Sequence, residues 1–277
     1  MKKHLNIFFP EWQGYGEDNT VQTGARILKN HFSKMEFAEI DVADEEALLT
    51  ANNIMGYEAN LRHLKHAVDL LTTVSPSSTF MIGGTCATEI GPVSYLNNYY
   101  NGDLAVLWFD AHGDLNTPES SGSKHFHGMP LRSLLGDGEA NVSELMFSRL
   151  QPKQVFVLGG RDLDEPELSY IVDSEIRLFT PEKLQDITHC IDSIKKAGFQ
   201  HLYIHVDLDV LEPEDFPHML LPVEKGVTVD HLFQLLEQLR EVFQIVGVSV
   251  VEYVPKDDSG LQSLERLVEL IHPEKLV

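Results

Sequence analysis

Apolar runs of strand length recur along the whole chain, and several are apolar throughout instead of alternating with polar residues. Continuous apolar runs are typical of strands that are buried on both faces of a parallel sheet. This feature restricts the fold more than any other. The clear runs are Leu5–Phe9, Thr79–Ile82, Leu104–Phe109, Gln154–Leu158, Ile176–Phe179, His201–Val206 and Ile245–Val251, with a weaker candidate at Phe37–Val42.

Stretches with helical periodicity lie between these runs. Ala59–Leu71, Thr228–Val242 and Leu261–Ile271 each carry an apolar stripe, and Thr228 is a suitable N-cap for the second. Alternating strands and helices predict a parallel sheet covered by helices on both faces. No linker or repeat interrupts the pattern, so we expect residues 1–277 to form a single α/β domain.

The composition excludes several classes of partner. The formal net charge is −22, from 21 Lys and Arg against 43 Asp and Glu, which argues against binding to nucleic acid or an anionic membrane. The sequence contains no apolar run of about 18 residues, so we expect no transmembrane helix. Cys86 and Cys190 are too few and too far apart for a disulfide framework, so we expect a cytoplasmic protein.

Acidic residues gather where two of the predicted strands end. Asp110-Ala111-His112-Gly113-Asp114 follows one strand, and Asp207-Leu208-Asp209 follows another. In an open α/β sheet the carboxyl ends of the strands form the ligand-binding edge. Carboxylates that meet there repel one another unless a cation lies among them. Together with His112, they predict a divalent metal centre, most simply with two ions.

Four segments together resemble the signatures of the ureohydrolase (arginase/agmatinase) family. They are Gly83-Gly84-Thr85-Cys86-Ala87, Asp110-Ala111-His112-Gly113-Asp114, Asp207-Leu208-Asp209 with Glu212-Pro213, and Glu252-Tyr253-Val254-Pro255. The resemblance covers nearly all of the chain. It implies a three-layer α/β/α sandwich with a mainly parallel eight-stranded sheet. It also implies metal-assisted hydrolysis of a guanidinium group with release of urea.

The resemblance assigns roles to the acidic residues. Asp110 and Asp207 match ligands that bridge two Mn²⁺ ions. Asp114 and the residue at position 86 complete one site, and His112 and Asp209 complete the other. Two cations held by shared carboxylates lower the pKa of a bridging water and supply hydroxide at neutral pH. Glu252 matches the carboxylate that binds the guanidinium, and His127 matches a proton shuttle to the leaving amine.

The loop after the first metal motif resembles arginases more than agmatinases. Asn116, Ser121 and Ser123 match residues that hold the α-carboxylate of the substrate, and Asp164 matches the acid that meets its α-amino group. Each also has a purely structural alternative, because loop residues of these types often bond to their own backbone and an Asp can cap a helix.

The chain departs from the family pattern at two places. The usual metal-binding His is Cys86, preceded by Thr85, and the Gly-rich loop after the Asp-x-Asp signature is the bulkier segment 216–226. A buried Cys is often a small apolar residue, but a thiolate ligand would favour Zn²⁺ or Fe²⁺ over Mn²⁺. The loop change leaves specificity open.

Three functions remain open from the sequence. The first is hydrolysis of L-arginine to ornithine and urea. The second is hydrolysis of agmatine, a guanidino acid or formimidoylglutamate. The third is a non-catalytic relative with a degraded metal site. The resemblance further implies a homo-oligomer, either a trimer or a hexamer, with a small-molecule guanidino substrate as the ligand.

Overall fold

The fold of the chain is built on an eight-stranded sheet, seen in a computed structural model that describes residues 3–273. The strand order is β2-β1-β3-β8-β7-β4-β5-β6, and every neighbouring pair is parallel. The expected parallel α/β fold is therefore confirmed. The strands are β1 (His4–Phe9), β2 (Ala38–Glu39), β3 (Ser78–Gly83), β4 (Ala105–Phe109), β5 (Val155–Leu158), β6 (Arg177–Phe179), β7 (His201–Asp207) and β8 (Gln244–Val251).

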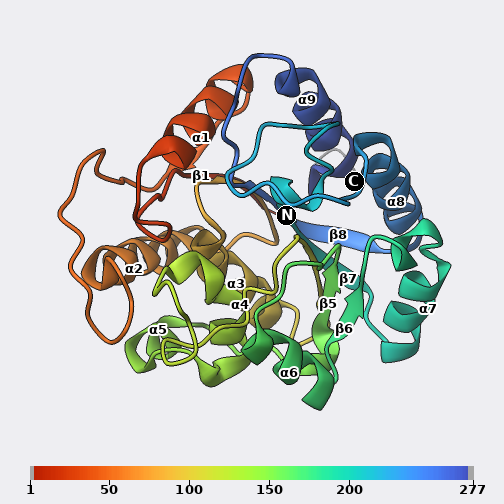
Figure 1. The fold of residues 1–277 in the computed structure, drawn as a ribbon, viewed down its shortest axis with the longest axis horizontal. Helices are drawn as coiled ribbons and strands as arrows, with labels where there is room; N and C mark the ends of the chain where they lie inside the picture. The colour runs from red at the N-terminus through yellow and green to blue at the C-terminus, as the bar shows by residue number, and fades with distance from the viewer. Residues whose placement is uncertain (1–2, 274–277) are drawn as a thin grey trace.

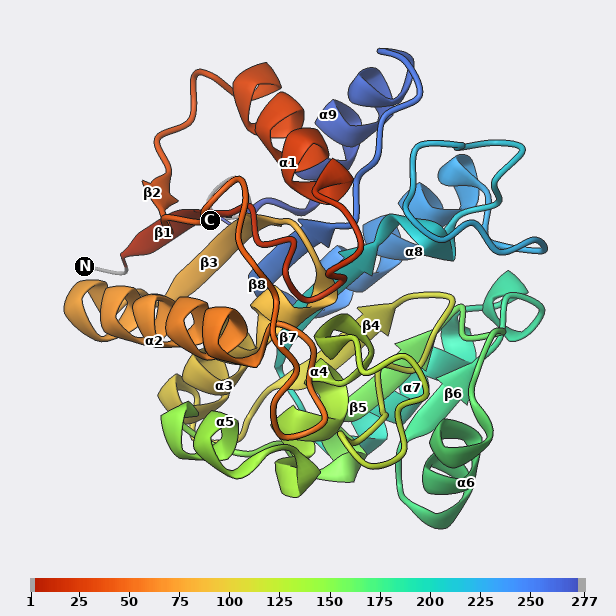
Figure 2. The same ribbon diagram turned by 60° about the vertical axis from the view of Figure 1, so that its left-hand side comes forward.

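Helices cover both faces of the sheet. On one face lie α1 (Thr20–His31), α7 (Thr188–Ala197), α8 (Val229–Val242) and α9 (Gly260–Ile271) (Figure 1). On the other lie α2 (Tyr57–Val74), α3 (Ile90–Tyr99) and α6 (Glu165–Asp173), with the short helices α4 (Pro130–Arg132) and α5 (Ala140–Leu145) beside them. Figure 2 shows α1 and α9 above the sheet and α2, α3, α5 and α6 below it.

The central strands are buried on both faces, as their uninterrupted apolar runs predict. In β7, Ile204 and Val206 pack under α8 and α9, whereas Tyr203 points into the core beneath α2 and α3. Successive residues of a strand point to opposite faces, so each central strand contributes to both cores. A run of this kind needs apolar residues at nearly every position.

The weaker strand candidate at 37–42 is a strand only at Ala38 and Glu39, where it pairs with β1 at the edge of the sheet. The helix predicted from residue 228 begins at Val229, and Thr228 is its N-cap, with Oγ1 accepting a hydrogen bond of 3.3 Å from the His231 amide. Within residues 3–273, no helix is both long enough and apolar enough to cross a membrane.

Four neighbouring strands, β3, β8, β7 and β4, end at the centre of one edge of the sheet. The residues that follow or end them are the ones singled out from the sequence. Cys86 lies three residues beyond β3, Asp110 follows β4, Asp207 ends β7 and Glu252 follows β8. Strand order thus brings four distant segments to one place.

Candidate metal centre and the cavity above it

The turn after β3 holds Cys86 against the ends of its neighbours. The Gly84 amide donates to the Phe9 carbonyl (2.9 Å), and the Gly84 carbonyl accepts from the Glu252 amide (2.8 Å). A β-carbon at Gly84 would lie 1.8 Å from the Glu11 carbonyl oxygen, so only glycine permits this approach. Cys86 then begins a short 3-10 turn, Cys86–Glu89, that leads into α3.

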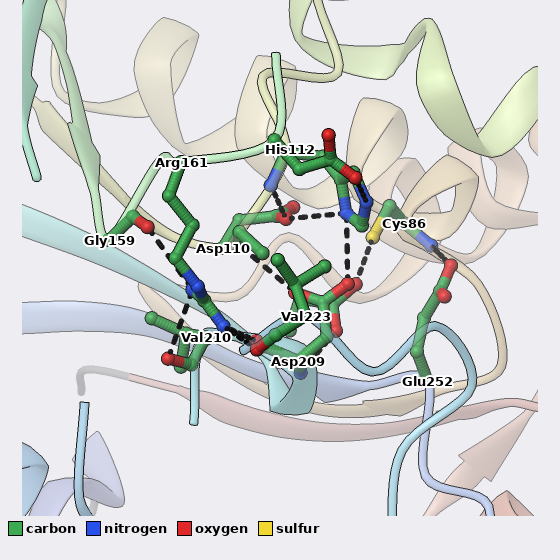
Figure 3. A network of polar contacts seen from close by, with 12 residues as sticks. Cys86, Asp110, His112, Gly159, Arg161, Asp209, Val210, Val223 and Glu252 are labelled. Carbon is green, nitrogen blue, oxygen red and sulfur yellow. Dashed lines mark hydrogen bonds and ion pairs between the residues drawn. The ribbon is translucent and has the colours of Figure 1, made fainter. Parts of the chain in front are cut away.

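Two groups of side chains bring metal-ligating atoms within 4.8 Å of one another. The first group is Cys86, Asp110, His205 and Asp207, and the second is Asp110, His112 and Asp209. Asp110 belongs to both. Figure 3 shows Cys86, Asp110, His112 and Asp209 around this centre.

Several short contacts define the geometry of the first group. Sγ of Cys86 lies 3.1 Å from Oδ2 of Asp207 and 3.7 Å from Nε2 of His205. Nε2 of His205 lies 3.7 Å from Oδ2 of Asp110. All four side chains are buried.

The second group is held by backbone amides as well as by its own charges. Nδ1 of His112 lies 2.9 Å from Oδ2 of Asp209 and 3.4 Å from Oδ1 of Asp110. The amides of Ala111 and His112 donate to Asp209 and Asp110, respectively. The turn after β4 therefore orients both carboxylates.

Asp114 lies beside the two groups but is a member of neither. Its backbone has a positive φ of 52°, and its side chain is buried. Among the described residues, its Oδ2 has no hydrogen-bond partner. A buried carboxylate oxygen without a donor is costly unless a cation or water satisfies it.

The carboxylates of the centre repel one another, and burial disfavours their charged forms. Burial, reinforced by neighbouring charges, raises the pKa of Asp114 and of Asp207 well above the ordinary value, and that of Asp209 to about 6. Burial also acts to raise the pKa of Asp110, but His112 and His205 outweigh it and hold that pKa low. A divalent cation would relieve the repulsion among these acids.

Cys86 shares this environment. Burial raises the pKa of its thiol well above the usual value, and Asp114, Asp207, Glu252 and Asp110 raise it further. A bound cation reverses this preference, because a coordinating thiol loses its proton. The donors present, which are carboxylate oxygens, imidazole nitrogens and a sulfur, fit divalent transition ions. The residues therefore fit the metal expected from the sequence.

Arg161 stabilises the backbone around Asp209 by hydrogen bonds to main-chain carbonyls. Its guanidinium donates to the carbonyls of Asp209 (2.8 Å) and Val223 (2.7 Å), and also to those of Gly159, Val210, Leu211 and Glu224. These bonds join the segment after β5 to the Asp209 turn and to the loop 216–226. This role of Arg161 was not anticipated from the sequence.

His127 and Glu252 form a pair next to the metal-ligand groups. Nδ1 of His127 lies 2.9 Å from Oε1 of Glu252, and the Cys86 amide lies 3.4 Å from the same oxygen. Glu252 has a positive φ of 59°, which turns its side chain away from the line of β8. Burial acts to lower the pKa of His127, but the carboxylate of Glu252 outweighs it, so that pKa is raised.

These groups open into one cavity of about 470 Å³. Its described lining contains seven acids and no Lys or Arg, which suits a cationic ligand. Ten of the twelve residues expected at the site from the sequence line it, and the other two, Asp110 and Asp209, belong to the metal-ligand groups. The ten are Cys86, His112, Asp114, Asn116, Ser121, Ser123, His127, Asp164, Asp207 and Glu252.

The four residues expected to bind the substrate tail lie in the wall of the cavity. Nδ2 of Asn116 donates to Oδ2 of Asp164 (2.8 Å), which joins the two although they are 48 residues apart in sequence. Asp164 also precedes α6 as its N-cap. Ser121 and Ser123 accept hydrogen bonds from the amides of Lys124 and His125. Ser123 and Asp164 are exposed.

Other lining residues were not anticipated. Tyr15, Glu17 and His125 contribute from the N-terminal loop and the 115–130 loop, and Leu221 contributes from the segment 216–226. Met219 is buried instead, in an isolated bridge with Tyr253. His205 was also missed, although it lies two residues before Asp207 on a strand and therefore on the same face.

The comparisons with known proteins agree with this arrangement. Residues 18–272 match the profile described as the arginase family. An arginase from Staphylococcus aureus (strain COL) is 30% identical over 258 residues, which cover 86% of this chain and 85% of that protein. An arginase from Bacillus subtilis (strain 168) is 32% identical over 209 residues, covering 71% and 69%.

Solved structures show the same fold. The crystal structure of Entamoeba histolytica arginase in complex with L-ornithine has a TM-score of 0.86 at 24% identity, covering 98% of this chain and 99% of that one. The native arginase structure from Bacillus caldovelox has a TM-score of 0.82 at 25% identity, covering 99% and 98%. On the profile match and the Staphylococcus aureus relative, the chain belongs to the arginase family of hydrolases that act on linear amidines.

Proposed function

We propose that this protein hydrolyses L-arginine to ornithine and urea at the cavity above the metal-ligand groups. One observation carries the proposal. The same cavity places the His127–Glu252 pair beside Cys86 and Asp207, and the Asn116–Asp164 pair in its wall. The names of the relatives, which are arginases, support the same substrate.

In this proposal the metal ions are two per chain, Mn²⁺ by family resemblance, with Zn²⁺ or Fe²⁺ as alternatives because of Cys86. Asp110 and Asp207 would be shared ligands, with His112 and Asp209 in one site and Cys86 and Asp114 in the other. When bound, such ions supply an activated water at neutral pH.

The side chains around the metals bind the substrate and transfer a proton in this proposal. The buried carboxylate of Glu252 binds the guanidinium by charge-assisted hydrogen bonds. His127, held through Nδ1 by Glu252, is placed to give a proton to the leaving amine. Asp164 contacts the α-amino group, and Asn116, Ser121 and Ser123 hold the α-carboxylate.

The charge of the cavity favours a guanidino cation over formimidoylglutamate. Glutamate carboxylates would enter a lining with seven acids and, among the described residues, no Lys or Arg. The α-carboxylate of arginine can be held at the wall by amide and hydroxyl donors, as Asn116 and the two serines offer. Assembly of the chain into a trimer or hexamer stays a prediction.

A substrate panel tests the function. Purified protein loaded with Mn²⁺, and separately with Zn²⁺, is assayed for urea release from arginine, agmatine and a guanidino acid, and for turnover of formimidoylglutamate. We expect the highest kcat/KM with arginine. An equal or higher value for agmatine would overturn the substrate assignment. No turnover by fully metallated protein would establish the non-catalytic alternative.

A further inference from the structure

His205 stands out as a buried imidazole that the expected metal-ligand set does not use. It is on β7, two residues before Asp207, with its side chain fully buried. In the register of the sheet it lies opposite Trp108 of β4. The two rings are stacked with centroids 3.7 Å apart and an interplanar angle of 20°. Trp108 also donates from Nε1 to Oδ2 of Asp110 (3.0 Å), so one indole positions both side chains.

Glu89 fixes the other end of the imidazole. Its Oε1 lies 3.1 Å from Nδ1 of His205, and both side chains are fully buried. The contact is at ion-pair distance without the alignment of a hydrogen bond. Glu89 is the last residue of the 3-10 turn Cys86–Glu89 and immediately precedes α3. Because Nδ1 faces a carboxylate, Nε2 is the nitrogen left to face the metal-ligand group.

Nε2 of His205 points at other potential ligands. It lies 3.7 Å from Sγ of Cys86 and 3.7 Å from Oδ2 of Asp110. A distance of 3.7 Å is too long for a hydrogen bond from nitrogen to a carboxylate oxygen. Bond lengths to zinc of 2.0–2.3 Å imply separations of about 3.3–3.7 Å between neighbouring ligand atoms of a tetrahedral site. The observed spacing from Nε2 to the two neighbouring ligand atoms therefore equals the spacing expected for atoms that share one ion.

We propose that His205 is a metal ligand through Nε2 and, in the place that the family pattern gives to Asp114, completes a four-donor site with Cys86, Asp110 and Asp207, while Glu89 and Trp108 are positioning residues. The arrangement of carboxylate, imidazole and metal is a recurrent way of fixing the tautomer and the orientation of a ligand. This inference deepens the proposed function, because it concerns the same metal centre and rests on metal binding there.

The donor set has a consequence for the choice of metal. One sulfur, one imidazole nitrogen and two carboxylate oxygens, all buried, make a site suited to Zn²⁺ or Co²⁺ rather than Mn²⁺. The second group, Asp110, His112 and Asp209, contains no sulfur. The two sites of one centre should therefore prefer different ions.

Metal counting on the full chain tests the proposal. His205→Phe keeps a flat ring against Trp108 but removes the donor nitrogen. Glu89→Gln keeps the imidazole and the packing but removes the carboxylate. His63→Gln is the matched control, because His63 is a buried histidine of α2 outside both ligand groups. Each protein is checked for folding by circular dichroism and then titrated with Co²⁺ and with Zn²⁺.

We expect His205→Phe to lose about one ion per chain relative to the wild type, together with the Co²⁺–thiolate charge-transfer band contributed by Cys86. Glu89→Gln should keep the stoichiometry but bind the sulfur-site ion about 10- to 100-fold more weakly. His63→Gln should behave as the wild type. Folded His205→Phe with unchanged stoichiometry and an unchanged thiolate band would overturn the proposal.

If His205→Phe fails to fold, Glu89→Gln provides the test of the proposal. An unchanged affinity of that variant for the sulfur-site ion would count against His205 as a ligand. Both readouts are independent of turnover. If the wild type binds metal as described but releases no urea from arginine, the proposed function fails while the ligand assignment stands.

Discussion

Nδ1 of His127 lies 2.9 Å from Oε1 of Glu252, joining a loop histidine to the residue that follows β8. Both side chains line the cavity that contains Cys86 and Asp207. The pair thus connects the proposed proton donor to the proposed guanidinium-binding carboxylate.

This pair predicts a pH dependence. The carboxylate of Glu252 outweighs burial and raises the pKa of His127 above its ordinary value of 6.5. A histidine whose pKa is raised on folding contributes stability below pH 6.5, and this contribution is lost as the pH rises through the folded-state pKa. Glu252→Gln should therefore lower the pKa of His127, as followed by NMR titration of its ring. His218, on a different loop, should titrate unchanged in the same spectra.

Asp110 is the one residue common to both metal-ligand groups. Asp110→Asn should therefore abolish binding at both sites, whereas Asp209→Asn should affect only the second group and leave about one ion per chain. Metal analysis of the purified variants measures this. Glu17→Gln, at an exposed acid of the same cavity, is the control and should keep the full complement. Full occupancy in Asp110→Asn would refute a shared ligand.

Asp164 is expected to bind the α-amino group of arginine. Asp164→Asn keeps a residue that can cap α6 but removes the charge. The charged hydrogen bond is worth about 1.5–3 kcal/mol, so kcat/KM for arginine should fall about 10- to 100-fold. Agmatine has no α-amino acid group and should be affected much less. Equal losses for the two substrates would show that Asp164 supports the loop rather than the substrate, since it also bonds to Asn116.

Glu11 predicts a second pH effect. Burial raises its pKa to about 7, against hydrogen bonds from Thr85 and Gly14 that act to lower it. Because its pKa is about 4.5 when unfolded, its contribution to stability is present below pH 4.5 and is lost as the pH rises through 7. The loss amounts to roughly 3 kcal/mol at about 1.4 kcal/mol per unit.

Urea denaturation of the wild type and Glu11→Gln at pH 5 and pH 8 measures this effect. The wild type should lose more stability than the variant over that interval. A parallel response in the two proteins would mean that Glu11 is already ionised in the folded state.

Arg161 donates to six backbone carbonyls, including those of Asp209 and Val223. Lysine offers a compact charge and cannot reproduce this planar set of donors. Arg161→Lys should lower the free energy of unfolding by roughly 2 kcal/mol and expose loop 216–226 to proteolysis. Arg26→Lys, which changes an exposed pair with Asp44, should have little effect on either measurement.

The sequence was sufficient for the layered parallel fold and for ten of the residues that line the cavity. Unbroken apolar runs and helical stripes are local patterns, so they identified seven strands closely, although α1, α3, α6 and α7 were not named. Asp110, Asp207 and Glu252 could be placed at strand ends because the ends of such runs are visible in the chain. Helix α3 was missed because it is buried on nearly all sides and contains Gly91 and Pro92, which obscure a stripe.

The tertiary structure alone decided which distant residues meet. Nothing local shows that β7 lies between β8 and β4, yet this order sets His205 against Trp108 and brings Glu89, from the connection between β3 and β4, to its Nδ1. The contact between Asn116 and Asp164 likewise depends on how two loops pack. Strand length and polarity are properties of a segment, whereas strand order and register result from packing among segments far apart in the chain.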